Sequence, residues 1–392
     1  MVACPGAFRM LVDGRRVVFV SATNGKTTTT KLLAAALRAA GPVVTNASGA
    51  NMPAGIVAAL ARPPVGVPAD ALAVLEADET YLPGLLPHTE KPLLVLGNLT
   101  RDQLDRVGEV AMVARRWRKV FGATKGLSAV ANADDPHVVW AASVIPDVTW
   151  VSVGQRWTAD SAVCPSCGSI LQRDSAGHWS CTCGFRRPEV SWSIESGNGD
   201  GGGELVGPDG ARYTLDLQLP GAANQANAAM AVVAADLLGV PPSVSLPAMR
   251  TVASVGGRYQ TVSLGGRRVR LLLGKNPAGW SEMFGMLAPA PAPVVIAINA
   301  RAADGKDPSW LWDVPFERLA DREVIATGDR RHDLAVRLLY ADVSHTTVAD
   351  PWVAGGLPFD AGLAGRPTLD AVGTYTAFRE LLRRGGGADD AS

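Results

Sequence analysis

The 392-residue sequence has no excess of charge of either sign. Its 37 lysines and arginines balance its 37 aspartates and glutamates, and its isoelectric point lies near 7.0. Proteins whose main work is to coat nucleic acid usually carry a basic excess. The balance therefore argues against that class, and we expect no nucleic-acid partner.

Long apolar runs are also missing. No uninterrupted apolar stretch approaches the roughly 18 residues of a membrane helix, and the opening MVACPGAFRMLVDGRR lacks the apolar segment of a signal peptide. We therefore expect a cytoplasmic protein whose contact with a membrane would be peripheral. The hydrophobic content of 47% is ordinary for a globular protein, and the length is sufficient for two domains.

Cysteine is scarce, and four of the 5 cysteines lie in CPSCGSILQRDSAGHWSCTCGF, residues 164–185. Two close pairs, each followed by glycine, favour a tetrahedral zinc site, although the second pair is C-x-C and not the commoner C-x2-C. Disulfides are disfavoured in a cytosolic chain, and four unliganded thiols are the other alternative. The few basic residues of the stretch favour a structural role over nucleic-acid binding. The expected zinc ligands are Cys164, Cys167, Cys181 and Cys183.

The first 150 residues repeat one scheme, an apolar run followed by an abrupt polar cluster. Examples are RVVFVSA, DALAVLEADE, KPLLVLGNLTRDQLD and GLSAVANADDP. Such alternation with helical segments predicts an α/β domain with a parallel sheet. Ligands of these sheets bind beyond the carboxyl ends of the strands. We therefore expect Glu76, Asn98 and Asn132, which fall at those ends, to share one site.

The opening glycine of a phosphate-binding loop is missing from VSATNGKTTTTK, residues 20–31, where Val20 stands in its place. The rest of the motif is present. Gly25 lets backbone amides approach a phosphate, Lys26 supplies positive charge, and Thr27 can place its hydroxyl on Mg²⁺. A bare GKT triplet could also be a helix N-terminus without a ligand. The strand-like run before the loop and the Ala/Leu-rich helical segment after it favour nucleotide binding.

This loop, together with four other segments, resembles the central ATPase domain of the Mur ligases. The segments are LEADE around Glu76, NLTRDQLD around Asn98, GAANQANAAMAV (221–232) and GGRYQ (256–260). The resemblance implies that ATP phosphorylates a carboxylate and that an amine attacks the acyl phosphate. Lys26 and Glu76 would be catalytic, and Thr27 and Glu76 would hold Mg²⁺.

The same resemblance implies a set of nucleotide contacts. Taken alone, the two asparagines of residues 221–232 could be helix caps, the arginine of GGRYQ a solvated turn residue, and Glu76 a surface carboxylate. The implied contacts are Thr23, Asn24, Gly25, Lys26, Thr27, Thr28, Asn224, Asn227 and Arg258.

Three features depart from the usual Mur pattern. The loop begins at residue 20, which leaves no room before it for the domain that holds a uridine nucleotide. The usual DHLD is DQLD, with Gln103 in place of a histidine that helps to hold metal. Trp117 stands in the register of the modified lysine of many Mur ligases, although Lys119 is close. We therefore expect the metal to be handled differently.

Apolar and helical segments alternate again after residue 260, which predicts a second α/β domain. KNPAGW, ADGKDPSWLWD and TGDRRHDLAVRLLYA resemble one branch of the Mur ligases, the MurT branch, and the resemblance covers nearly the whole chain. We expect a Mur-type central ATPase domain over residues 1–255 with a zinc ribbon inserted at about 160–188. A smaller α/β domain would cover 256–385, and a disordered tail 386–392.

The MurT branch comprises the synthetase subunits of lipid II isoglutaminyl synthase. The resemblance implies ATP-dependent amidation of the α-carboxylate of D-isoglutamate in the lipid II stem peptide, giving D-isoglutamine for peptidoglycan synthesis. Lipid II would be met at the inner face of the plasma membrane. An enzyme that acts on a lipid-linked substrate would not require the domain that binds a uridine nucleotide.

This chain offers no cysteine for a glutaminase, because four are assigned to zinc and Cys4 has no nucleophile context. The resemblance implies a heterodimer with GatD, a class I glutamine amidotransferase subunit that supplies ammonia. An aspartate of the C-terminal domain would complete the catalytic Cys–His pair of that partner. Asp304, Asp307 and Asp313 are the candidates, and Asp307 and Asp313 are favoured, although each could be a loop or helix-cap carboxylate.

Trp310 and Trp312, in the same segment, could face the partner, but core positions are the simpler interpretation. Two other functions stay open. One is a stand-alone Mur-type ligase that joins an amino acid to a peptidoglycan precursor. The other is a zinc-ribbon binding protein that uses ATP as a switch, against which the neutral charge argues.

Overall fold

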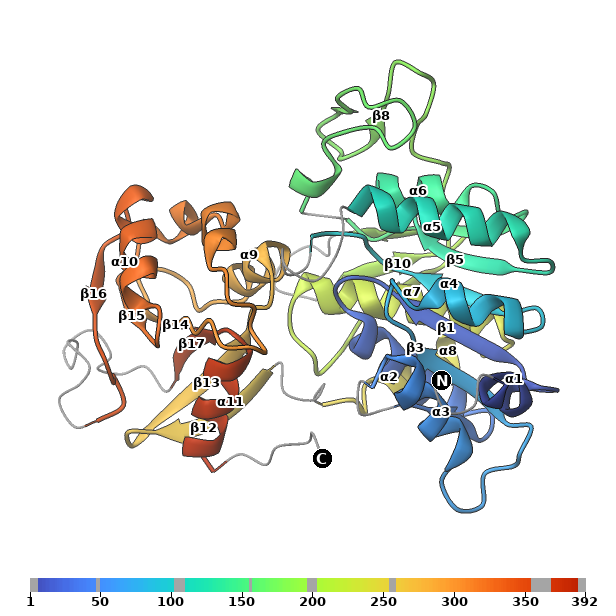
Figure 1. Ribbon diagram of the computed structural model, residues 1–392, viewed down its shortest axis with the longest axis horizontal. Coiled ribbons are helices and arrows are strands. Elements are labelled where there is room, and N and C mark those ends of the chain that lie inside the picture. Colours follow the sequence, from blue (N-terminus) through green and yellow to red (C-terminus); the bar gives the residue numbers. More distant parts are fainter. Residues whose placement is uncertain are drawn as a thin grey trace. The chain divides into compact units, whose positions relative to one another are not determined.

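The computed structural model describes residues 6–46, 50–101, 110–154, 157–195, 203–253, 259–353 and 368–386. The chain divides into two compact units (Figure 1). The first comprises Met1–Thr100 and Gly108–Ala253, and the second Arg101–Val107 and Ser254–Ser392. The expected domain boundary lies in 254–258 and almost all of the expected tail in 387–392, outside the described residues, so both stay predictions.

The described part of the first unit contains a nine-stranded sheet in the order β11-β10-β9-β6-β5-β4-β1-β3-β2. Strands β2 to β6 and β1 are parallel, β9 joins β6 in parallel, and β10 and β11 extend the sheet as an antiparallel meander. The strands are β1 (Val17–Ser21), β2 (Val43–Thr45), β3 (Leu72–Glu76), β4 (Leu93–Leu96), β5 (Ser128–Asn132), β6 (Asp147–Ser152), β9 (Trp192–Glu195), β10 (Glu204–Val206) and β11 (Arg212–Thr214).

Helices pack in groups around this sheet. Helices α2, α7 and α8 contact one another, and α5 contacts α4 and α6. Every residue of β1 and of β4 is buried, which explains why their sequences are continuously apolar and do not alternate. The helices are α1 (Ala7–Val12), α2 (Lys26–Arg38), α3 (Pro53–Ala61), α4 (Leu82–Leu85), η1 (Leu86–His88), α5 (Val110–Ala123), α6 (Pro136–Ala142), η2 (Ala159–Ser161), α7 (Ala222–Leu237) and α8 (Pro242–Met249).

Residues 163–187, hereafter the ribbon, form a separate lobe of the first unit beside α6 (Figure 1). The lobe carries the short antiparallel pair β7 (Gln172–Arg173) and β8 (Trp179–Ser180). Trp179 packs against Phe185 with ring centroids 4.9 Å apart, and a small apolar cluster joins Trp179 to Val139 of α6. The ribbon therefore has a core of its own that continues into the first unit.

The described part of the second unit has a six-stranded sheet in the order β12-β13-β17-β14-β15-β16, parallel except for β12. Its strands are β12 (Tyr259–Leu264), β13 (Arg267–Leu273), β14 (Val294–Ala297), β15 (Val324–Thr327), β16 (His345–Thr347) and β17 (Leu369–Gly373). Its helices are α9 (Pro277–Gly285), η3 (Ser309–Asp313), η4 (Phe316–Leu319), α10 (Arg331–Tyr340) and α11 (Tyr375–Arg384).

Alternate residues of the second sheet enter two different cores. In β14, Val294 and Ile296 pack with residues of α9, η3, η4 and α10, whereas Val295 and Ala297 pack with residues of α11. Both faces of the sheet are thus covered, as parallel sheets require. The predicted α/β class is confirmed for both units. In the part of the chain that the structure describes, no helix combines the length and hydropathy needed to cross a bilayer.

Candidate functional site

The phosphate loop is the short turn between β1 and α2. Gly25 has φ +86°, and a Cβ atom at this position would lie 2.3 Å from Oδ1 of Asn227, so no side chain fits there. Val20, which replaces the opening glycine of the usual motif, lies inside β1 and pairs with Glu76 of β3 and Val95 of β4. The strand continues through this position, and the loop therefore needs no glycine there.

The loop is fastened to the segment that follows β4. The amide of Thr23 donates to the carbonyl of Asn98 at 2.8 Å, and the amide of Asn24 donates to Oδ1 of Asn98 at 3.0 Å. Nδ2 of Asn98 donates back to the carbonyl of Asn24 at 3.0 Å, and the hydroxyl of Thr23 lies 3.1 Å from the carbonyl of Thr100. These contacts fix the two loop residues before the helix begins.

The first turn of α2 supplies the remaining donors. The first N–H groups of a helix have no intrahelical acceptor, and they carry the positive end of the helix dipole. In α2 these belong to Lys26, Thr27 and Thr28, since the amide of Thr29 already donates to the carbonyl of Gly25. This arrangement is suited to phosphate oxygens.

Lys26 is a buried cation, 7% exposed, whose ammonium lies 2.7 Å from Oε2 of Glu79. Burial acts to lower the pKa of Lys26, but the nearby carboxylates of Glu79, Asp78 and Glu76 outweigh it, and the pKa is raised. The raised pKa stabilises the fold below about pH 10.5, and this contribution is lost as the pH rises through the pKa of the folded state. Lys26 is therefore charged at neutral pH.

Glu76 ends β3 and is 2% exposed. Its Oε1 accepts a hydrogen bond from Nδ2 of Asn51 at 3.0 Å, while its Oε2 is buried without a hydrogen-bond partner among the described residues. A buried carboxylate oxygen without a donor is costly unless a cation binds it. Glu76 thus has the properties of a ligand for a hard divalent cation. Thr27, the other predicted magnesium ligand, is half-buried in the first turn of α2, and its role stays a prediction.

The two predicted asparagines of α7 differ in their surroundings. Oδ1 of Asn227 accepts from the hydroxyl of Thr29 at 3.2 Å, which brings α7 against the start of α2. Nδ2 of Asn224 donates to the carbonyl of Pro220 at 2.6 Å, the helix-end contact that was its alternative interpretation. Asn227 is thus placed at the phosphate loop. The predicted Arg258, with Gln103 and Cys4, lies outside the described residues.

Sequence reasoning missed Glu79 and underestimated Trp117. Trp117 is fully buried, and its indole N–H donates to the carbonyl of Glu79 at 2.8 Å. The indole thus fixes the backbone of the residue paired with Lys26, and the register of Trp117 with the modified lysine of other Mur ligases stays a prediction. Lys119 is exposed. In the sequence, Glu79 stood out only as the third carboxylate of LEADE, after Glu76 and Asp78.

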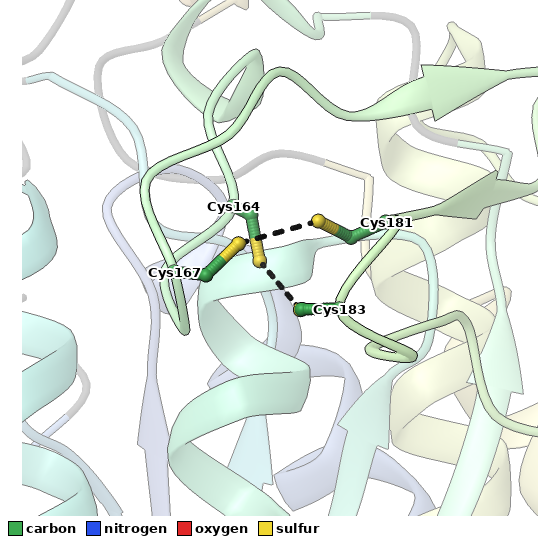
Figure 2. Close-up of side chains that lie close together, drawn as sticks. All are labelled: Cys164, Cys167, Cys181 and Cys183. Atoms are coloured by element: carbon green, nitrogen blue, oxygen red, sulfur yellow. Dashed lines mark hydrogen bonds between the residues drawn. The ribbon is translucent and has the colours of Figure 1, made fainter.

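The four cysteines of the ribbon converge on one point (Figure 2). Their Sγ atoms all lie within 4.8 Å of one another, with 3.9 Å between Cys164 and Cys183 and 3.5 Å between Cys167 and Cys181. Each pair ends in a tight turn whose glycine, Gly168 or Gly184, has φ near +85° in the left-handed region. The cluster can hold a metal ion.

The thiols of this cluster differ in acidity. Hydrogen bonds from Ser169 lower the pKa of Cys167 to about 6. Burial raises the pKa of Cys164 to about 12. Because thiolates and not thiols bind metal, a bound ion would favour ionisation of all four cysteines.

Of the three candidate aspartates in the second unit, only Asp304 is buried. Its carboxylate accepts from the amide of Thr376 at 2.7 Å and so caps α11. Asp307 and Asp313 are exposed, and Asp313 pairs with Arg101 at 3.2 Å. The two favoured residues are therefore the ones that a partner could reach, and their role stays a prediction.

Trp310 and Trp312, which lie between Asp307 and Asp313 in the sequence, differ in exposure. Trp310 is 7% exposed and stacks on Trp280, as its core interpretation required, whereas Trp312 is 55% exposed and packs edge-on against Tyr340.

We expect Glu79→Gln to lower the free energy of unfolding by about 3 kcal/mol, because it leaves a buried ammonium without its carboxylate. Saturation with a non-hydrolysable ATP analogue should then raise the melting temperature of the variant by more than that of the wild-type chain, since phosphate oxygens replace the lost charge. Asp78→Asn is the matched control, with the same change of charge one residue away. Loss of nucleotide binding in Glu79→Gln would contradict this role.

Comparisons with known families agree with this geometry. The family model of the Mur ligase middle domain matches residues 20–235, and the model of the MurT ligase C-terminal domain matches residues 273–378. The chain is 33% identical to lipid II isoglutaminyl synthase (glutamine-hydrolyzing) subunit MurT of Staphylococcus aureus, over 94% of this chain and 86% of that one. It is 31% identical to the subunit of the same name from Streptococcus pneumoniae, over 84% and 77%.

Solved structures show the same fold at lower identity. A pseudomurein peptide ligase type C from Methanothermus fervidus superposes with a TM-score of 0.67 at 19% identity, over 94% of this chain and 79% of that one. MurF from Acinetobacter baumannii gives 0.66 at 15% identity, over 96% and 78%. With the phosphate loop, the buried carboxylates and the cysteine ribbon in the predicted order, the chain belongs to the Mur ligase family and, within it, to the MurT ligases.

Proposed function

We propose that this chain is an ATP-dependent carbon–nitrogen ligase that amidates the α-carboxylate of D-isoglutamate in the lipid II stem peptide. The observation that carries the proposal is the buried Lys26 at the start of α2, paired with Glu79 and within the electrostatic influence of Glu76, whose Oε2 has no hydrogen-bond donor among the described residues. Relatives that share a third of its residues over most of its length bear the name of this activity.

In this proposal the carboxylate attacks the γ-phosphorus of ATP, which forms an acyl phosphate and releases ADP. Ammonia then attacks the acyl carbon, phosphate leaves, and the nitrogen loses a proton. Lys26 and the first-turn amides would bind the phosphates, with Asn227, and with Arg258 as the resemblance implies. Glu76 and Thr27 would hold Mg²⁺, which neutralises charge on the transferring phosphoryl group.

Ammonia would come from a GatD-type glutaminase subunit, since the four described cysteines converge on one metal-binding point and offer no nucleophile paired with histidine. Asp307 and Asp313 are exposed in the second unit and are the proposed aspartates for completing the catalytic pair of that partner. Because lipid II is anchored in a bilayer, the complex would act at the cytoplasmic face of the membrane.

We also propose that the ribbon binds zinc as a structural ion. A tetrahedron with Zn–S bonds of about 2.3 Å has sulfur–sulfur edges of about 3.8 Å. Two of the sulfur pairs are 3.5 and 3.9 Å apart, and all four atoms lie within 4.8 Å of one another. The complete Cys4 donor set favours zinc over hard cations.

Removal of zinc should unfold the ribbon. Elemental analysis of the purified chain is expected to give one zinc per chain, and Cys164→Ser should lose it together with several degrees of melting temperature. Asp174→Asn, in the exposed hairpin of the same ribbon, should keep the metal. A chain that contains no zinc, or a Cys164→Ser variant that keeps it, would contradict the assignment.

A stand-alone amino-acid ligase is the rival function, and one assay separates the two. The chain is incubated with lipid II, MgATP and ammonium chloride, and the product is identified by mass spectrometry. We expect amidated lipid II, and Lys26→Ala should reduce the rate by at least about a hundredfold. If ammonium gives nothing, the assay is repeated with the glutaminase subunit and glutamine. ATP hydrolysis without amide in both formats would overturn the proposal, and incorporation of an amino acid would support the rival.

A further inference from the structure

The ribbon forms hydrogen bonds with a polar turn of the first unit, residues 133–135, which follows β5. The indole N–H of Trp179 donates to the carbonyl of Ala133 at 3.1 Å. Nε of Arg187 lies 2.7 Å from Oδ1 of Asp134, and the two side chains are only 12% and 9% exposed. Two adjacent residues of the turn are therefore held by two side chains of the ribbon.

The next residue of the turn reaches toward the phosphate loop. Asp135 is fully buried, and its Oδ1 caps α6 by accepting from the amides of His137 and Val138. Its Oδ2 accepts from the amide of Leu99 at 2.8 Å. A buried carboxylate oxygen that loses its donor is destabilised, so displacement of the turn would be transmitted to Leu99.

Leu99 is the centre of the segment that fastens the loop. Its neighbours, Asn98 and Thr100, make the hydrogen bonds to Thr23 and Asn24 described above. A continuous series of buried and half-buried hydrogen bonds thus leads from the ribbon through the turn at 133–135 to the first residues of the phosphate loop. None of the residues in this series, apart from those of the loop itself, is expected to contact a phosphate.

We propose that the ribbon is a positioning element for nucleotide binding, in which Trp179 and Arg187 act as positioning residues through Asp134 and Asp135. The inference rests on the proposed nucleotide site and deepens it, since it assigns the inserted ribbon a part in setting the loop. The physical reason is that hydrogen bonds near 2.8 Å are lost with displacements below 1 Å, and buried donors and acceptors have no water to replace the lost partner.

The test uses Trp179→Phe, which keeps an aromatic ring in the ribbon core but removes the N–H. Equilibrium binding of a fluorescent, non-hydrolysable ATP analogue is measured together with hydrogen exchange of residues 20–31. We expect binding about tenfold weaker and faster exchange in the loop, at unchanged metal content. Arg187→Gln should act in the same direction, with partial rescue in Arg187→Lys.

Two control variants separate positioning from general loosening. Phe185→Leu disturbs the packing around Trp179 without removing a hydrogen bond to the turn, and Arg212→Gln breaks an exposed ion pair elsewhere in the first unit. Both should bind nucleotide as the wild type does. Equal affinity and exchange in Trp179→Phe and wild type, or equal weakening in Phe185→Leu, would overturn the inference alone. A wild-type chain that binds no nucleotide would overturn the proposed function together with the inference.

Discussion

The buried ammonium of Lys26 is the charge on which the nucleotide site depends. The parallel pairing of β1 with β3 brings the start of α2 to the carboxylates that follow β3, and Lys26 lies within 2.7 Å of Glu79. The positive charge is therefore balanced before any nucleotide arrives, which keeps the lysine in place at low cost. Phosphate oxygens of a bound nucleotide would share the positive charge of Lys26 with Glu79.

The rest of the first unit serves to hold this arrangement. Trp117 fixes the backbone of Glu79, and Asn98 fixes the loop before Lys26. The ribbon extends the same support from outside the sheet, through the turn that follows β5. A small inserted lobe with its own cysteine cluster therefore need not be a separate binding module, since hydrogen bonds join it to the polar edge of the sheet.

The sequence alone could predict the features that depend on local chemistry. Gly25 requires a left-handed backbone, Gly168 and Gly184 end the cysteine pairs, and continuous apolar runs indicate strands covered on both faces. Contacts between residues far apart in the chain could not be found in this way. Glu79 meets Lys26 across 53 positions, and Asp135 meets Leu99 across 36, through the order of the strands and not through any motif.

The two tryptophans of the second unit illustrate the same limit at short range. Trp310 and Trp312 are two positions apart in η3, and only the packing of this short helix against Trp280 determines that the first is buried and the second exposed. The aromatic pattern of the sequence did not show which of the two tryptophans would be buried.

In the proposed reaction, the loop around Lys26 binds the ATP whose γ-phosphoryl group passes to a carboxylate of the substrate. The most direct measurement uses lipid II labelled with ¹⁸O in the α-carboxylate of its D-isoglutamate, with MgATP and ammonium or glutamine plus the partner subunit. Passage through an acyl phosphate predicts that each amide formed leaves one ¹⁸O atom in the released inorganic phosphate. Amide formation accompanied by unlabelled phosphate would show that the carboxylate is not phosphorylated and would contradict the account.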